Sequence, residues 1–216
     1  MDEINSIRFA SVGASFIEDV SGTSMMWNKN LTFLKGKSYL LSGISGSGKT
    51  SAMNMMYGNL KPSTGEVFFN NQSLTNIKKA TWRDVRKNHL SYLFQGFKLI
   101  ENLTVFENIV LKASLTRGFN NDRILQFLEE LDLIDFAHKK VQILSFGQRQ
   151  RVAFIRGLCQ NYDFVLLDEP FSNLDPHNTE LLCELLSREL ALQKAGLIMA
   201  THHIQPPIEF DYVVAV

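Results

Sequence analysis

Apolar positions in the first third of the chain come in short runs that are separated by turn residues. Such runs are typical of β-strands, and here they predict strands at 7–12, 31–33, 38–41 and 66–69. Residues 50–57 predict a helix before the last of these strands, with methionines that are expected to fill the core. This part of the chain is therefore predicted to combine a small antiparallel β-layer with the start of an α/β core.

The spacing of apolar residues becomes helical in the middle of the chain. A short helix at 81–87 and a strand at 90–94 come first. Helices are then predicted from Thr104 to a stop at Gly118, over 121–131, and from near Ser145 to Leu158. Because no strand is predicted between residues 97 and 144, we expect this stretch to be a helical insert.

The last third of the chain alternates strands and helices. The apolar run Phe164–Leu167 predicts a strand that is buried on both faces of a parallel sheet. A long helix is predicted from Pro176 to Lys194, with Asp175 as its N-cap and Gly196 as its C-cap. Further strands are predicted at 197–200 and 212–216. This alternation predicts a mostly parallel sheet.

The segment Gly43–Thr50 reads G-x-x-x-x-G-K-T, which is the phosphate-binding P-loop pattern. It lies between a predicted strand and a predicted helix, so the helix N-terminus faces the same anion. The alternative is a Gly/Ser-rich turn that ends by chance in Lys-Thr, which is expected in under roughly one chain in a hundred of this length. Nucleotide phosphates are therefore expected to contact Gly43, Ser45, Gly46, Ser47, Gly48, Lys49, Thr50 and Ser51.

The predicted fold class is α/β: a P-loop NTPase core of the RecA-like kind, with a mostly parallel sheet, an antiparallel β-layer and a helical insert. We expect one domain over 1–216, in which residues 1–95 and 145–216 form the core with the β-layer and residues 96–144 form the helical subdomain.

Composition narrows the classes of function. The chain has 216 residues, is 45% hydrophobic, and carries 22 basic and 22 acidic side chains. A zero net charge gives no electrostatic reason to expect nucleic acid or an anionic membrane as a partner. No apolar run reaches the length needed to span a bilayer, and the N-terminus has no signal-peptide pattern. Cys159 and Cys183 fall in helical patterns and are expected to be buried, which fits a reducing cytoplasm.

Two adjacent carboxylates, Asp168 and Glu169, follow the apolar strand directly. Ligands of open α/β sheets bind at the carboxyl ends of the strands. In a chain with a P-loop, Asp168 is therefore expected on the Mg²⁺ side and Glu169 as the general base for an attacking water. The alternative is that the two acids only begin a loop.

Five further motifs follow the P-loop in a fixed order and carry a resemblance. They are Tyr92–Gln95 as Q-loop, Leu144–Arg151 as LSGGQ signature, Leu166–Pro170 as Walker B, Ser172–Asp175 as D-loop and Thr201-His202 as switch histidine. Together they cover nearly the whole chain, which resembles an ABC-type ATPase, the nucleotide-binding subunit of an ATP-binding cassette system. Phe146 departs from the signature, because it stands where the family has its first glycine.

The resemblance implies a role for each of these residues. Gln95 would help to order Mg²⁺ and the attacking water, together with Thr50 and Asp168 as the metal side of the site. His202 would hydrogen-bond to the γ-phosphate. Ser145, Gly147 and Gln148 would touch the ATP that a second subunit holds, although Ser145 is also a plain helix N-cap. Phe16 stands where the family stacks an aromatic ring on adenine, and it could equally be a core residue.

The segments at 95–109 and 61–67 resemble the branch that serves lipoprotein release, macrolide efflux and cell division. The resemblance implies ATP and Mg²⁺ as cofactors, an ATP-dependent homodimer, and a separate transmembrane permease that holds the chain at the cytoplasmic face of the membrane. Apolar residues that follow Gln95 are a candidate docking surface for this permease, or else a small satellite core. They are Phe97, Leu99, Ile100, Leu103 and Phe106.

Two other classes remain as alternatives. A soluble ABC-type ATPase would act on a protein complex without a permease, but such proteins usually carry paired cassettes, coiled coils or basic patches, which this sequence lacks. A P-loop GTPase would need the guanine-reading pattern N-K-x-D, which Asn28-Lys29-Asn30 does not supply, and a P-loop kinase would need an acceptor site and lid arginines.

Overall fold

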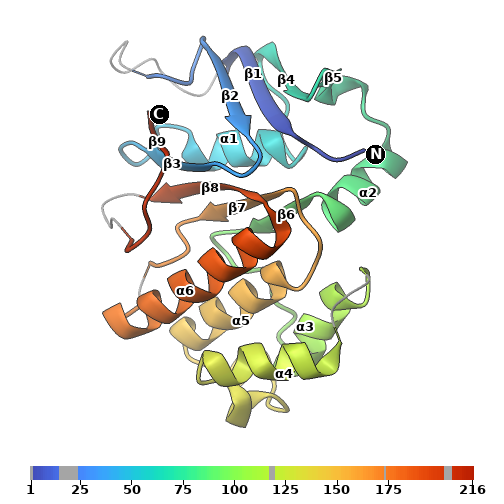
Figure 1. The fold of residues 1–216 in the computed structure, drawn as a ribbon, viewed down its shortest axis with the longest axis vertical. Helices are drawn as coiled ribbons and strands as arrows, with labels where there is room; N and C mark the ends of the chain where they lie inside the picture. Colours follow the sequence, from blue (N-terminus) through green and yellow to red (C-terminus); the bar gives the residue numbers. More distant parts are fainter. Residues whose placement is uncertain (1, 15–23, 117–119, 173, 202–205) are drawn as a thin grey trace.

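Two β-sheets, one antiparallel and one parallel, lie one above the other in the structure (Figure 1). The computed structural model describes residues 2–14, 24–116, 120–172, 174–201 and 206–216. The antiparallel sheet has four strands in the order β2-β1-β4-β5. Its strands are β1 Ser6–Gly13, β2 Asn30–Leu34, β4 Thr64–Phe69 and β5 Gln72–Ser73. This is the predicted antiparallel β-layer, to which the structure adds the short strand β5.

The second sheet is parallel and has five strands in the order β6-β7-β8-β3-β9. Its strands are β3 Ser38–Ser42, β6 Leu90–Leu93, β7 Phe164–Asp168, β8 Gly196–Thr201 and β9 Tyr212–Ala215. The structure has two hydrophobic cores, one on each face of this sheet. Side chains of β7 alternate between them: Phe164 and Leu166 pack in one core, and Val165 and Leu167 pack in the other. The period of two puts them on opposite faces, so β7 is buried on both faces, as predicted.

Helices cover both faces of the parallel sheet (Figure 1). Helix α1 (Lys49–Met56) lies between the two sheets, and Met53, Met55 and Met56 fill the core there. On the opposite face lie α5 (Phe146–Leu158) and α6 (Pro176–Gln193), whose apolar residues share a core with Leu167 and Met199. Cys159 and Cys183 are buried in this second core. The predicted α/β fold class is confirmed.

The remaining helices occupy the middle of the chain. They are a 3-10 turn at Leu74–Asn76, α2 Lys79–Asn88, α3 Val105–Ala113, α4 Asn121–Glu130, and 3-10 turns at Ile134–Phe136 and Val141–Ile143. Thr104 and Glu107 form a capping box that starts α3. The predicted end of this helix was wrong: α3 ends at Ala113, and Leu115 is exposed because the chain tightens into turns through Thr116. The division at 96–144 into a separate subdomain stays a prediction.

The predicted cap at the end of α6 was also wrong. Lys194, with φ 51°, adopts the left-handed conformation that ends the helix, a conformation that usually favours glycine. Gly196 instead begins β8, where a Cβ atom would lie 2.6 Å from the ring of Phe164. Gly196 is therefore required for close packing between β8 and β7 and not for helix termination. In the described part of the chain, no helix has the length and apolarity to cross a membrane.

A cluster of charged groups joins distant segments at the amino end of β7. Asp163 accepts hydrogen bonds from the backbone N–H of Ile4 (2.8 Å) and from Lys35 Nζ (2.6 Å), and it pairs with His89 Nδ1 (2.6 Å). Burial by itself raises the pKa of Asp163, but the hydrogen bonds from His89 and Lys35 outweigh it and hold the pKa below its usual value. Asp163 thus ties the segment before β1, the β2–β3 turn and the junction of α2 with β6 to the start of β7.

Asp163→Asn is expected to lower the free energy of unfolding at pH 7 by about 2 kcal/mol, because Lys35 then keeps only the exposed Glu3 as a counterion. The folded-state pKa of Asp163 is depressed, so its stabilisation is present above the unfolded pKa and is lost as the pH falls through the folded pKa. The difference between the two proteins should therefore shrink as the pH falls below about 4 and vanish only below the folded-state pKa. Urea unfolding checks this, with exposed Asp135→Asn as control; equal midpoints for Asp163→Asn and wild type at pH 7 would contradict it.

Candidate active site

The P-loop connects the end of β3 to the start of α1 at the carboxyl end of the parallel sheet. Gly48 is the N-cap of α1, with φ 100°, and no side chain caps the helix. A Cβ atom on Gly43 would lie 2.4 Å from the Val216 carbonyl oxygen and 2.7 Å from Ser47 Oγ. Glycines thus permit a tight loop at the N-terminal end of α1, which is the kind of place where an anion binds. Within the loop, Ser47 N–H donates to the Ile44 carbonyl oxygen at 3.2 Å.

Lys49 places its ammonium group inside this loop. Its Nζ donates hydrogen bonds to the carbonyl oxygens of Gly43 (2.7 Å) and Ile44 (2.8 Å). The residue is 5% exposed, and burial lowers the pKa of Lys49, while the nearby carboxylates of Glu169 and Asp168 act in the opposite direction. The loop itself is open, since Ile44, Ser45 and Gly46 are exposed. A buried cation therefore lies behind backbone that solvent can reach.

Trp27 supports the loop from behind, which the sequence did not predict. Its indole N–H donates to the carbonyl oxygen of Ser47 at 2.9 Å, and its ring is buried in the core between the sheets. This contact fixes the orientation of one peptide of the P-loop. A single tryptophan between two predicted strands gives no sequence signal for such a role.

Asp168 lies at the end of β7 and is 2% exposed. Burial raises the pKa of Asp168, and the charge of Glu169 adds to this, whereas hydrogen bonds with the Thr50 and Tyr92 hydroxyls oppose it. The Tyr92 hydroxyl donates to Asp168 Oδ2 over 3.5 Å. The hydroxyl of Thr50 and a carboxylate oxygen of Asp168 thus lie close together. Both are the hard oxygen ligands that Mg²⁺ prefers. The residues present fit a magnesium ion that also binds phosphate oxygens.

Glu169 is held beside Asp168 in an uncommon backbone conformation, with φ 52°. Its N–H donates to the Ala200 carbonyl oxygen (3.0 Å), and Ser172 Oγ donates to the Glu169 carbonyl oxygen (3.1 Å). Such a conformation typically costs about 1–3 kcal/mol and persists only where its surroundings impose it. Gln95, in the exposed segment after β6, donates from Nε2 to Glu169 Oε2 at 3.2 Å. The structure therefore joins Gln95 to Glu169, 74 residues apart in sequence.

The signature segment forms the start of α5. Ser145 is the N-cap: its Oγ accepts from Gln148 N–H (3.3 Å), while Gln148 Oε1 accepts from Ser145 N–H (2.9 Å). Gly147 approaches Leu174, whose Cδ2 would lie 3.4 Å from a Cβ atom. In the described part of the chain, Ser145, Gly147 and Gln148 form no hydrogen bond with the P-loop of the same chain. The structure thus does not bring the signature together with this chain's own P-loop.

Phe146, the departure from the signature pattern, is 51% exposed. Its ring packs against Phe97, with the ring centroids 4.9 Å apart. A second contact ties the signature helix to the segment after Glu169. Gln150, buried on α5, donates from Nε2 to the Pro170 carbonyl oxygen at 2.6 Å. The signature helix is therefore tied both to the segment after Gln95 and to the segment after Glu169.

Phe16 and His202 lie outside the described residues, so their roles stay predictions.

A family model described as ABC transporter matches residues 27–172, which is more than half of the chain. The chain therefore belongs to the ABC transporter family and is an ABC-type ATPase domain, the class of protein that binds and hydrolyses ATP. Ser51 and the other P-loop residues fall within the matched range, as do Gln95, the signature and both acids.

Two solved structures are similar over nearly the whole chain. One is the dimeric post-hydrolysis state of the ATP-binding cassette MJ0796 bound to ADP and Pi: 29% identical, TM-score 0.78, covering 91% of this chain and 88% of that chain. The other is a dimeric structure of MJ0796, described as a bacterial ABC transporter cassette: 29% identical, TM-score 0.76, covering 90% and 87%.

Proposed function

We propose that this chain is the ATP-binding and ATP-hydrolysing subunit of a transporter, and that it drives a separate membrane permease through ATP-dependent dimerisation. The hydrogen bond from Gln95 to Glu169 carries the proposal. It joins the acidic end of β7 to the segment that leads into the helical part of the chain. A change at the nucleotide can therefore reach a surface distant from the nucleotide.

Each residue of the site has a proposed task in hydrolysis. The P-loop N–H groups and Lys49 bind the phosphates, and Thr50, Asp168 and Gln95 hold Mg²⁺, which supplies positive charge to the phosphate oxygens when bound. Glu169 accepts the proton of the attacking water. His202 is proposed to hydrogen-bond to the γ-phosphate and Phe16 to stack on adenine, as the resemblance implies.

Two copies of the chain are proposed to complete the site head to tail. Ser145 is exposed at the N-terminal end of α5, where the helix dipole favours an anion. In a head-to-tail dimer, Ser145, Gly147 and Gln148 of one copy face the γ-phosphate held by the other. The dimeric state of both MJ0796 structures supports this arrangement.

The permease is proposed to dock near the segment after Gln95, at the cytoplasmic face of the membrane. Among the apolar residues singled out there, Ile100 is 48% exposed, while Phe97, Leu99 and Phe106 pack partly against the core. Phe97, Leu99 and Phe106 therefore fit the alternative of a small satellite core better than a docking surface. The exposed apolar surface extends instead to Leu111 on α3, which is 48% exposed. The lipoprotein-release, macrolide-efflux and cell-division branch remains the proposed branch.

Purification of the tagged chain from membranes in mild detergent tests the transport function. An integral membrane protein is expected to copurify with the chain and not with the tag alone. If none is recovered, the transporter proposal fails, and a soluble ABC-type ATPase that acts on a protein complex takes its place.

A further inference from the structure

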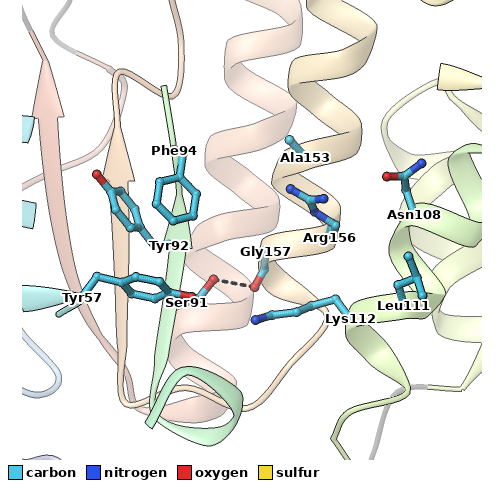
Figure 2. A pocket seen from close by; sticks show the side chains of 10 residues that line it. All are labelled: Tyr57, Ser91, Tyr92, Phe94, Asn108, Leu111, Lys112, Ala153, Arg156 and Gly157. Carbon is cyan, nitrogen blue, oxygen red and sulfur yellow. Dashed lines mark hydrogen bonds between the residues drawn. The ribbon is translucent and has the colours of Figure 1, made fainter. Parts of the chain in front are cut away.

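A cavity of about 180 Å³ opens between the parallel sheet and the helical part of the chain. Figure 2 shows its lining: Tyr57, Tyr92 and Phe94 form one wall, while Lys112 reaches in from α3 and Arg156 from α5. Binding pockets for drug-sized ligands typically measure about 300–1,000 Å³. This cavity is therefore suited to one or two side chains of a protein partner.

Lys112 and Arg156, the two cations of the cavity, have no acidic counterpart among the residues that the structure describes. No carboxylate is among the described residues that line it, and neither Lys112 nor Arg156 forms an ion pair within the described ranges. Burial, with a smaller effect from the charge of Arg156, lowers the pKa of Lys112 to about 8, and burial also lowers the pKa of Arg156. Half-buried cations without a counterion are unfavourable, and a carboxylate would relieve both.

Lys112 and Arg156 each have N–H donors that are not used in hydrogen bonds within the described residues. Lys112 Nζ donates to the Arg86 carbonyl oxygen at 3.2 Å, and an ammonium has three donors. Arg156 donates from Nη1 to the Lys98 carbonyl oxygen (2.7 Å) and from Nη2 to that of Phe97 (2.5 Å), out of five N–H donors. A carboxylate that enters the cavity can thus be bound without breaking these hydrogen bonds.

We propose that this cavity receives an Asp or Glu side chain from an apolar segment of the partner protein, with Lys112 and Arg156 as its cationic receptors. The inference rests on the proposed transport function and specifies the chemistry of its permease contact. The aromatic wall and the exposed side chain of Leu111 would cover the apolar neighbours of that acid.

The position of Arg156 links the cavity to the nucleotide site. Phe97 and Lys98, whose carbonyls it holds, both have left-handed backbones, with φ 56° and 54°, and they directly follow Gln95 and Gly96. Phe97 also packs on Phe146 at the signature helix. A carboxylate bound to Arg156 therefore contacts the residue that holds this segment in place.

The test is recovery of the integral membrane protein by tagged variants of the full chain. Lys112→Glu is expected to reduce recovery about tenfold or more, because a buried charge pair becomes a repulsion. Lys112→Arg keeps the charge and is expected to recover the protein as wild type does, as is Lys139→Glu, an exposed site in the same helical part. If Lys112→Glu lowers the melting temperature, Lys112→Gln replaces it in the test, because it removes the positive charge without introducing a negative one.

A carbodiimide, which joins an amine directly to a carboxylate, is then applied to the wild-type complex. Support is reduced recovery with Lys112→Glu together with a cross-linked peptide that joins Lys112 to an Asp or Glu of the membrane protein. If Lys112→Glu recovers as much membrane protein as wild type, the inference is overturned and the transport function stands. If wild type itself recovers no membrane protein, both are overturned.

Discussion

Glu169→Gln is expected to slow ATP hydrolysis at least about a hundredfold while ATP still binds. The amide cannot accept a proton from the attacking water, whereas its size and its hydrogen bond to Gln95 are nearly those of the acid. Hydrogen bonds from Glu169 N–H to Ala200 and from Ser172 to the Glu169 carbonyl hold the backbone in place. The substitution thus removes the base and leaves the geometry.

Steady-state phosphate release and equilibrium ATP binding, measured separately, check this prediction. Glu180→Gln, an exposed site on α6, is the matched control and should hydrolyse ATP at the wild-type rate. Wild-type turnover in Glu169→Gln would remove Glu169 from the mechanism.

Lys49→Ala is expected to weaken ATP binding about tenfold to a hundredfold and to abolish hydrolysis, since hydrogen bonds to charged groups contribute roughly 1.5–3 kcal/mol. Its ammonium is the buried cation of the P-loop and lies 2.7 Å from the Gly43 carbonyl oxygen. Without it, the phosphate charge is met only by backbone N–H groups and any bound metal ion.

Isothermal titration with ATP measures the affinity. A melting curve shows whether the hydrogen bonds from Lys49 to the P-loop carbonyls are needed for folding. Lys61→Ala, an exposed lysine after α1, is the control. An unchanged ATP affinity in a folded Lys49→Ala protein would show that the ammonium does not bind phosphate.

Sequence alone predicted the parts of the site that depend on local spacing. The P-loop needs glycines next to a strand and a helix, and the acids need only to follow a buried strand, so both are visible within a few residues. The resemblance assigned Gln95 to the site that holds Glu169, but the contact between the two side chains was not predicted. It arises because β6 and β7 are neighbours in the sheet, and strand order is set by packing that spans the whole chain.

Contacts between distant single residues gave no sequence signal. Trp27 behind the P-loop, Tyr92 beside Asp168 and the ring pair of Phe97 with Phe146 are each produced by tertiary structure. Two predicted helix ends, those of α3 and α6, were wrong, and at α6 the reason is again tertiary packing. A glycine is the usual stop, but Lys194 adopts the left-handed conformation itself, while Gly196 is used for packing.

The central claim is that ATP closes two copies of this chain around shared sites, and light scattering on Glu169→Gln tests it most directly. With saturating ATP and Mg²⁺, the mass is expected to be twice the 24.6 kDa of the chain, and with ADP it is expected to return to that of the monomer. Hydrolysis-deficient protein that stays monomeric at high concentration with ATP bound would contradict the claim.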